Sequence, residues 1–152
     1  MKTARFLLLG MIAVALAAPQ DKPAEKEKKD EPRVLKVKLD YSGSGVVDTR
    51  HPIYVFLFDS PDFVKGAGMP IGDATATAKD QTVTISGVSA GTVYAVAAYD
   101  PHGAYDGQSG PPPSGSSMGM YNKTPGTPEP IKIEPGQTVT IDLPFDDSYK
   151  MP

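Results

Sequence analysis

Two aspartates near the middle of the chain have a spacing that could bind a cation. Asp100 and Asp106 lie in the segment Asp-Pro-His-Gly-Ala-Tyr-Asp-Gly-Gln-Ser-Gly. Carboxylate and backbone carbonyl oxygens of such a loop are the ligands that Ca²⁺ prefers. The spacing matches an Asp-rich calcium loop only in part, and Asp and Gly also form ordinary turns. We therefore favour an ordinary turn and keep calcium as an alternative; no other cofactor is predicted.

Three tyrosines and one histidine in and around the same segment could form a ligand surface. Tyr99, Tyr105 and Tyr121 each offer a flat apolar face with a polar tip, which suits a sugar or a peptide. His102 lies between the first two and is included as a candidate binding residue. Tyrosines more often pack in a core or under a loop, so packing is the competing interpretation.

The patterns that resemble catalytic motifs lack the partners that catalysis needs. Residues 115–119, Gly-Ser-Ser-Met-Gly, fit the spacing G-x-S-x-G, but they lie in a Pro/Gly-rich stretch and no histidine follows Ser117. A nucleophile elbow needs a strand before the serine, a helix after it and a base histidine. His51 and His102 have no Cys, His or Glu at zinc spacing. The sequence therefore predicts that the chain is not an enzyme.

The segments that must position these residues show a period of two. Leu35, Val37 and Leu39 alternate with charged residues, which is typical of a strand that buries one face. Residues 53–58 are apolar throughout, which is typical of a central strand covered on both faces. The predicted strands cover residues 35–41, 53–58, 74–78, 82–86, 92–99, 131–133 and 138–143. The pattern predicts an all-β fold, an antiparallel β-sandwich of about seven strands, with a small open barrel as the alternative.

One predicted connection is longer than a compact sandwich needs. Residues 100–130 are rich in proline and glycine and carry no strand pattern. Structureless connections of this length are usually functional or disordered. Its three consecutive prolines, residues 111–113, favour a stiff polyproline II segment, which could be a recognition element or a strut. We favour the strut.

The N-terminus has the pattern of an export signal. Lys2 and Arg5 precede an apolar run over residues 6–16 and small residues at Ala15 and Ala17. This order is typical of a cleavable signal peptide. The apolar run is shorter than the roughly 20 residues that a membrane-spanning helix needs. We therefore predict export to the periplasm or the exterior, and no membrane span in the mature chain.

A change in composition predicts the domain boundaries. Between Pro19 and Pro32 most residues are charged and none is a large apolar one, so this segment cannot bury enough surface to fold. We predict a signal peptide at residues 1–17, a disordered charged linker at 18–32 and a β-sandwich domain at 33–152.

Charge and cysteine content limit the partners. The chain has 152 residues, a net charge of −3 and no cysteine. Loss of Lys2 and Arg5 with the signal peptide makes the charge still more negative. A nucleic acid or an anionic membrane favours a basic surface, so neither is predicted as a partner. Without disulfides, an exported domain must be stabilised by its apolar core or by a metal.

Two stretches resemble a known superfamily. Residues 84–96, Thr-Ile-Ser-Gly-Val-Ser-Ala-Gly-Thr-Val-Tyr-Ala-Val, and residues 134–143, Glu-Pro-Gly-Gln-Thr-Val-Thr-Ile-Asp-Leu, look like the carboxypeptidase-regulatory-like, transthyretin-like sandwich superfamily. Residues 94–107 are also similar to an uncharacterised bacterial exported family, although His102 and Ala104 stand where that family tends to have Asn. The resemblance implies an immunoglobulin-like or transthyretin-like sandwich and a non-catalytic accessory or binding module.

These observations together predict a module of the cell envelope that binds a protein, peptide or glycan through the 100–130 loop. The alternative is a structural accessory subunit that pairs with a partner through exposed sheet edges. A calcium-dependent binding module and a hydrolase are less favoured.

Overall fold

The structure is a computed structural model that describes residues 31–152. The predicted signal peptide at 1–17 and nearly all of the predicted linker at 18–32 lie outside the described residues. Within the described part, no helix has the length and apolar character to cross a membrane.

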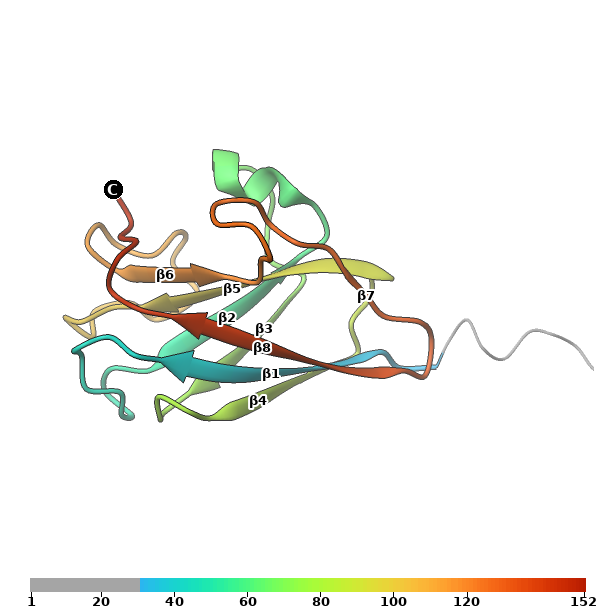
Figure 1. The fold of residues 1–152 in the computed structure, drawn as a ribbon, viewed down its shortest axis with the longest axis horizontal. Helices are drawn as coiled ribbons and strands as arrows, with labels where there is room; N and C mark the ends of the chain where they lie inside the picture. Colours follow the sequence, from blue (N-terminus) through green and yellow to red (C-terminus); the bar gives the residue numbers. More distant parts are fainter. Residues whose placement is uncertain (1–30) are drawn as a thin grey trace, which may run out of the picture.

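The described residues form eight strands and one short 3-10 helix, which confirms the predicted all-β fold. The elements are β1 (Val34–Tyr41), β2 (Ile53–Phe58), η1 (Pro61–Lys65), β3 (Gly72–Ala76), β4 (Thr82–Ser86), β5 (Thr92–Tyr99), β6 (Ser117–Met120), β7 (Ile131–Lys132) and β8 (Thr138–Phe145). Figure 1 shows these strands as two layers, with β4, β1 and β8 in one and β2 and β5 in the other.

The two sheets have the orders β4-β1-β8 and β3-β2-β5-β6. All pairs are antiparallel, as predicted, except the pair of β1 and β8, which run parallel with Val34 opposite Thr138 and Tyr41 opposite Phe145. The chain crosses to the other sheet between these strands, so no hairpin turn fixes their direction. The alternation of apolar residues is the same in parallel and antiparallel strands, so the sequence does not distinguish the two kinds of pairing.

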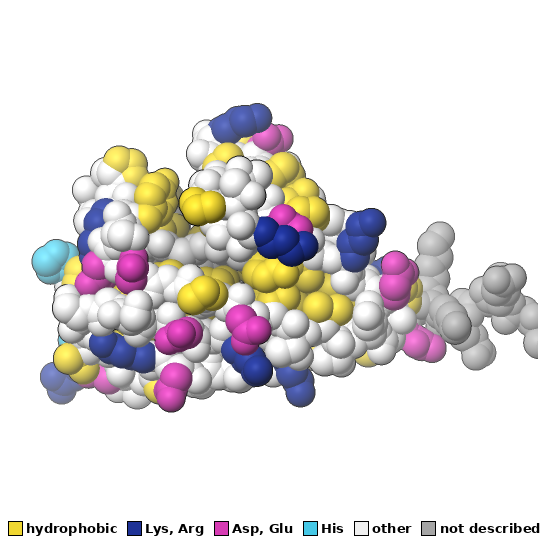
Figure 2. Space-filling model, viewed as in Figure 1, with side chains coloured by type: hydrophobic (Ala, Val, Ile, Leu, Met, Phe, Trp, Pro, Cys, Tyr) yellow, Lys and Arg dark blue, Asp and Glu magenta, His cyan; other side chains and the backbone are white. Residues whose placement is uncertain are grey.

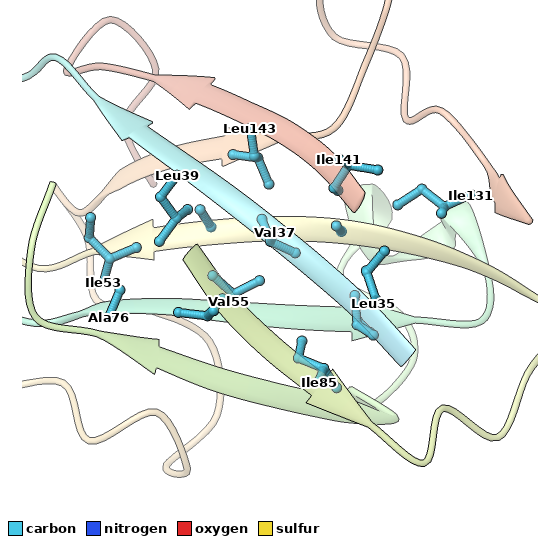
Figure 3. Close-up of a cluster of buried hydrophobic side chains, with 14 of the residues drawn as sticks. Leu35, Val37, Leu39, Ile53, Val55, Ala76, Ile85, Ile131, Ile141 and Leu143 are labelled. Carbon is cyan, nitrogen blue, oxygen red and sulfur yellow. The ribbon is translucent and has the colours of Figure 1, made fainter. Parts of the chain in front are cut away.

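The core lies between the facing sheets. In β1 the buried residues alternate with exposed ones, so Leu35, Val37 and Leu39 all point inward. Figure 3 shows these side chains in one cluster with Ile141 of the adjacent strand β8 and Val55 of β2 in the facing sheet. Full burial of one such side chain contributes roughly 1.5–3 kcal/mol. This core therefore stabilises a domain that has no disulfide.

The strand count differs from the prediction because the predicted 100–130 loop contains a strand. β6 and β7 pair with the same edge of β5, with Met120 opposite Val96 and Ile131 opposite Val93. Between them the chain leaves the sheet at residues 121–130 and returns. The long connection is thus two shorter loops, 100–116 and 121–130. Because β6 reads Ser-Met-Gly-Met, it offers few β-forming residues, and its four residues are too short a run for the alternation to stand out.

A glycine-containing turn after β1 passes directly over two tyrosine rings. The rings of Tyr41 and Tyr99 are in contact, with centroids 4.9 Å apart and planes tilted by 41°, and Tyr99 donates its hydroxyl hydrogen to the carbonyl of Val46. A Cβ atom added at Gly43 would overlap the Tyr41 ring, and one added at Gly45 would overlap the Tyr99 ring. The turn needs these glycines for the close approach of its backbone.

We expect Gly45→Ala to lower the free energy of unfolding by about 1–3 kcal/mol, because the buried Tyr99 ring has no free space to move into. Urea unfolding of the mature chain measures this change. Gly91→Ala is the matched control, since its added Cβ would have its nearest neighbour at 3.8 Å. Equal losses in the two variants would contradict the packing argument.

Candidate functional site

The outer face of the β3-β2-β5-β6 sheet carries a second apolar cluster. Phe56, Ala98 and Tyr105 are buried there, with Tyr54 and Phe58 packed against them. In β2 these aromatic residues alternate with the core residues Val55 and Leu57, so both faces of the strand are apolar. An apolar outer face needs a cover, as the continuous run at 53–58 predicted.

Two loops supply this cover and leave a groove between them. The 59–71 loop follows β2 and the 100–116 loop follows β5; since the two strands are antiparallel, the loops begin at opposite ends of the sheet. The groove has a volume of about 560 Å³. Its larger lining side chains are Phe56, Phe58, Phe63, Met69, Val96, Tyr105, Pro111, Pro112, Met118 and Met151. In Figure 2 hydrophobic side chains lie on both sides of the notch at the top of the view.

The first wall is held by η1. Ser60 caps this helix by accepting the amide hydrogen of Asp62 at 3.2 Å, and Gly66 ends it with a φ of +76°. Phe63 stacks on Phe58 with ring centroids 4.8 Å apart, which fixes the helix to the sheet. Met69 lies on the rim of this wall with 80% of its surface exposed.

The second wall is held by Asp100. Its buried carboxylate accepts the amide hydrogens of His102, Ala104 and Tyr105 at 2.8–2.9 Å. Burial alone would raise the pKa of Asp100, but these three hydrogen bonds outweigh it and lower the pKa below its usual value. The turn places Tyr105 edge-on against Tyr54 at 5.1 Å between centroids. Asp100 is therefore a positioning residue for the groove.

The second candidate calcium ligand also accepts hydrogen bonds from its own loop. Asp106 accepts the amide hydrogens of Gln108 and Ser109, each at 2.8 Å, and the Ser109 hydroxyl hydrogen. The Ser109 hydroxyl and the two amides lower the pKa of Asp106 to about 2. In the described part of the chain, no three His, Cys, Asp or Glu residues group closely enough to hold a metal ion. Calcium binding stays a prediction, and an ion would have to compete with these amides.

The structure separates the three predicted tyrosines. Tyr99 lies in the core between the sheets, Tyr121 is partly buried and packs against that same core, and Tyr105 lies on the opposite face under the 100–116 loop. They do not form one platform, and only Tyr105 lines the groove. His102 is exposed on its loop outside the lining.

Several groove residues have no signal in the sequence. Phe63 and Met69 lie in a connection without a periodic pattern, and Met118 lies in the undetected strand β6. The available signal was the apolar run at 53–58, which predicted that something covers the outer face. It does not reveal which segments provide the cover.

A polar cluster around Asp147 holds the start of β6 and the C-terminal segment, which contribute Met118 and Met151 to the groove. The carboxylate accepts hydroxyl hydrogens from Tyr41 and Ser117, each at 2.6 Å, and the amide hydrogen of Ser44 at 2.9 Å. The bonds from Ser117, Tyr41 and Ser44 hold the pKa of Asp147 well below its usual range. Burial, followed by the bond to Asp147, raises the pKa of Tyr41 to about 12.

The C-terminal segment (residues 148–152) lies along β6. Met118 donates its amide hydrogen to the carbonyl of Tyr149 at 2.9 Å, and Met151 donates to Ser116 at 2.8 Å. Gly115 donates to the carbonyl of Met151 at 2.9 Å. The segment thus covers the outer edge of β6 and places Met151 in the groove lining.

The serine of the G-x-S-x-G match lies inside this cluster. Ser117 is 0% exposed; its hydroxyl donates to Asp147 and accepts from Lys150 Nζ at 2.6 Å. Lys150 Nζ also lies 3.2 Å from the Asp147 carboxylate. The Ser117 hydroxyl is thus fully buried and makes hydrogen bonds on both sides, which gives it a structural role.

A second hollow, of about 450 Å³, lies on the outer face of the other sheet. Its lining includes Lys38, Asp40, Asp80 and Asp142. Lys38 and Asp142 are 3.7 Å apart with side chains 58% and 82% exposed, so water solvates both charges. The apolar groove is therefore the stronger candidate site.

No family model, curated protein or solved structure matches the chain. The resemblance to the transthyretin-like superfamily accordingly stays a prediction from the residues. The function has to be argued from the side chains of the groove.

We expect Asp147→Asn to reduce the free energy of unfolding at pH 7 by about 1–2 kcal/mol, because an amide accepts fewer of the five hydrogen bonds that the carboxylate accepts. The folded-state pKa of Asp147 is depressed, so its contribution is present above the unfolded pKa of about 3.9 and declines as pH falls below that value. Urea unfolding between pH 7 and pH 2 should therefore show the two proteins converging in acid. The exposed Asp142→Asn serves as control; a loss for Asp147→Asn that does not change with pH would contradict the assignment.

We expect the melting temperature of the mature chain to be the same in excess Ca²⁺ and in a chelator. The carboxylates of Asp100 and Asp106 already accept amide hydrogens, whereas a bound ion must raise the stability of the native state. Calorimetry in both buffers measures this. A rise with Ca²⁺ that is lost in Asp106→Asn would instead establish the calcium site.

Proposed function

We propose that the mature chain is an exported, non-catalytic binding module that holds an apolar segment of a protein or peptide in the groove between the 59–71 and 100–116 loops. The N-terminal pattern of charge and hydropathy supports export. The apolar lining of the groove is the observation that carries the binding proposal.

The lining favours a peptide over a glycan. Among the lining residues, Asp73 and Gln108 are the polar side chains besides Tyr105, whose hydroxyl already donates to the carbonyl of Gly110. A sugar would leave most of its hydroxyls unpaired there, at a cost in desolvation. Apolar side chains of a peptide would instead exclude water from the aromatic floor.

Size and side-chain type also suit a peptide. The volume of about 560 Å³ lies within the roughly 300–1,000 Å³ of ligand sites. Met69, Met118 and Met151 come from three different segments and give the groove flexible, polarisable walls. Flexible methionine surfaces accept apolar side chains of several shapes.

The test selects peptides on the mature chain from a random twelve-residue phage library and measures their affinities by isothermal titration. We expect selected peptides to carry apolar or aromatic side chains, and Met69→Lys to weaken their binding by about tenfold or more. Val46→Lys is the matched control, because Val46 is an apolar residue outside the lining with 69% of its surface exposed.

Two results would contradict the proposal that the groove binds a peptide. Binding that is unchanged in Met69→Lys and lost in Val46→Lys would place the ligand at Val46 and outside the groove. Failure to select any peptide with folded protein would remove the peptide as ligand. Circular dichroism confirms that both variants are folded before affinities are compared.

A further inference from the structure

The outer edge of β6 already holds an extended segment, which shows what this edge accepts. Residues 149–151 lie antiparallel to it, with Lys150 opposite Ser117 and three backbone hydrogen bonds of 2.8–2.9 Å. β5 occupies the other edge of β6. The C-terminal segment therefore pairs with the sheet edge through one β-bridge, as an extended peptide that adds to a sheet would.

Two neighbouring side chains of this segment make different contacts. Lys150 donates to the Ser117 hydroxyl at 2.6 Å and to the Asp147 carboxylate at 3.2 Å. Met151 lines the apolar groove. Tyr149 is 58% exposed. The edge thus suits a basic residue followed directly by an apolar one. The position before the basic residue, where Tyr149 lies, faces solvent and imposes little preference on the side chain.

We propose that the β6 edge is an acceptor site for an extended segment of another protein, and that the C-terminal segment occupies it until such a segment takes its place. The incoming segment carries Lys or Arg, which pairs with Asp147, followed by an apolar residue that enters the groove. This inference rests on the proposed function, because it adds a backbone-pairing mode and a charge preference to the same groove.

The geometry allows this exchange without disturbing the core. Asp147 keeps its bonds to Tyr41, Ser44 and Ser117 when residues 148–152 leave. The resident pairing is short, because it consists of one β-bridge and three backbone hydrogen bonds. A competing segment can bind only those molecules in which the β6 edge is open. Its apparent dissociation constant is therefore the intrinsic one divided by the open fraction.

The test uses the full mature chain and a synthetic peptide with the sequence of residues 148–152, Ser-Tyr-Lys-Met-Pro. A variant with Lys150→Glu and Met151→Asp releases the resident segment, because Glu is repelled by Asp147 and Asp does not suit the apolar groove. We expect the peptide to shift the amide resonances of Gly115 and Met118 in this variant, and to bind it about tenfold or more tightly than wild type. A peptide with Glu in place of Lys is the matched control and should not bind.

Three results would overturn the proposal. The first is a folded variant in which the peptide shifts neither amide, and the second is equal binding of the Lys and Glu peptides. The third is a concentration-dependent dimer of wild type that disappears in the variant, because it would make a second copy the partner. Peptide binding in the groove is tested separately on the wild-type protein. If the phage-selected peptides still shift the Met69 methyl resonance there, the proposed function holds and only the edge site is ruled out.

Discussion

The Asp147 carboxylate joins the two sheets at the end of the sandwich where β1 ends and β6 begins. It accepts hydrogen bonds from Tyr41 at the end of β1 and from Ser117 at the start of β6. Ser117 is fully buried, and a buried hydroxyl without a partner costs more free energy than a hydrogen bond contributes. Lys150 approaches the same carboxylate, so the position of the C-terminal segment also depends on it. The start of β6 and the C-terminal segment, which carry the groove residues Met118 and Met151, therefore both depend on one acceptor.

The groove itself follows from the composition of β2. This strand presents Val55 and Leu57 to the main core and Phe56 and Phe58 to the outer face. A sheet with two apolar faces needs a second layer on each side, and only one side faces the other sheet. The loops after β2 and β5 supply the missing layer from opposite ends, without meeting in the middle. The space between them leaves an apolar surface of a kind that soluble proteins use for binding.

The strands with clear alternation could be predicted from the sequence, because burial of one face imposes a period of two on β1, β4 and β8. β6 could not, since its neighbours in the sheet and not its own residues make it a strand. In β5 both faces are apolar, so alternation could not assign Tyr99 to the core. The Asp147 cluster was equally hidden, because Ser117 and Asp147 are 30 positions apart and meet only after folding.

The parts of the groove differ in how firmly they are held. Phe56 and Tyr105 lie in a buried aromatic cluster, and Asp100 fixes its loop through three amides. The C-terminal segment has three backbone bonds and an ion pair whose side chains are 40% and 32% exposed. Exposed pairs of this kind contribute about 0–1 kcal/mol. Local opening requires the least free energy where few buried contacts are lost, so the C-terminal segment should open before either loop and leave both the core and the groove floor intact.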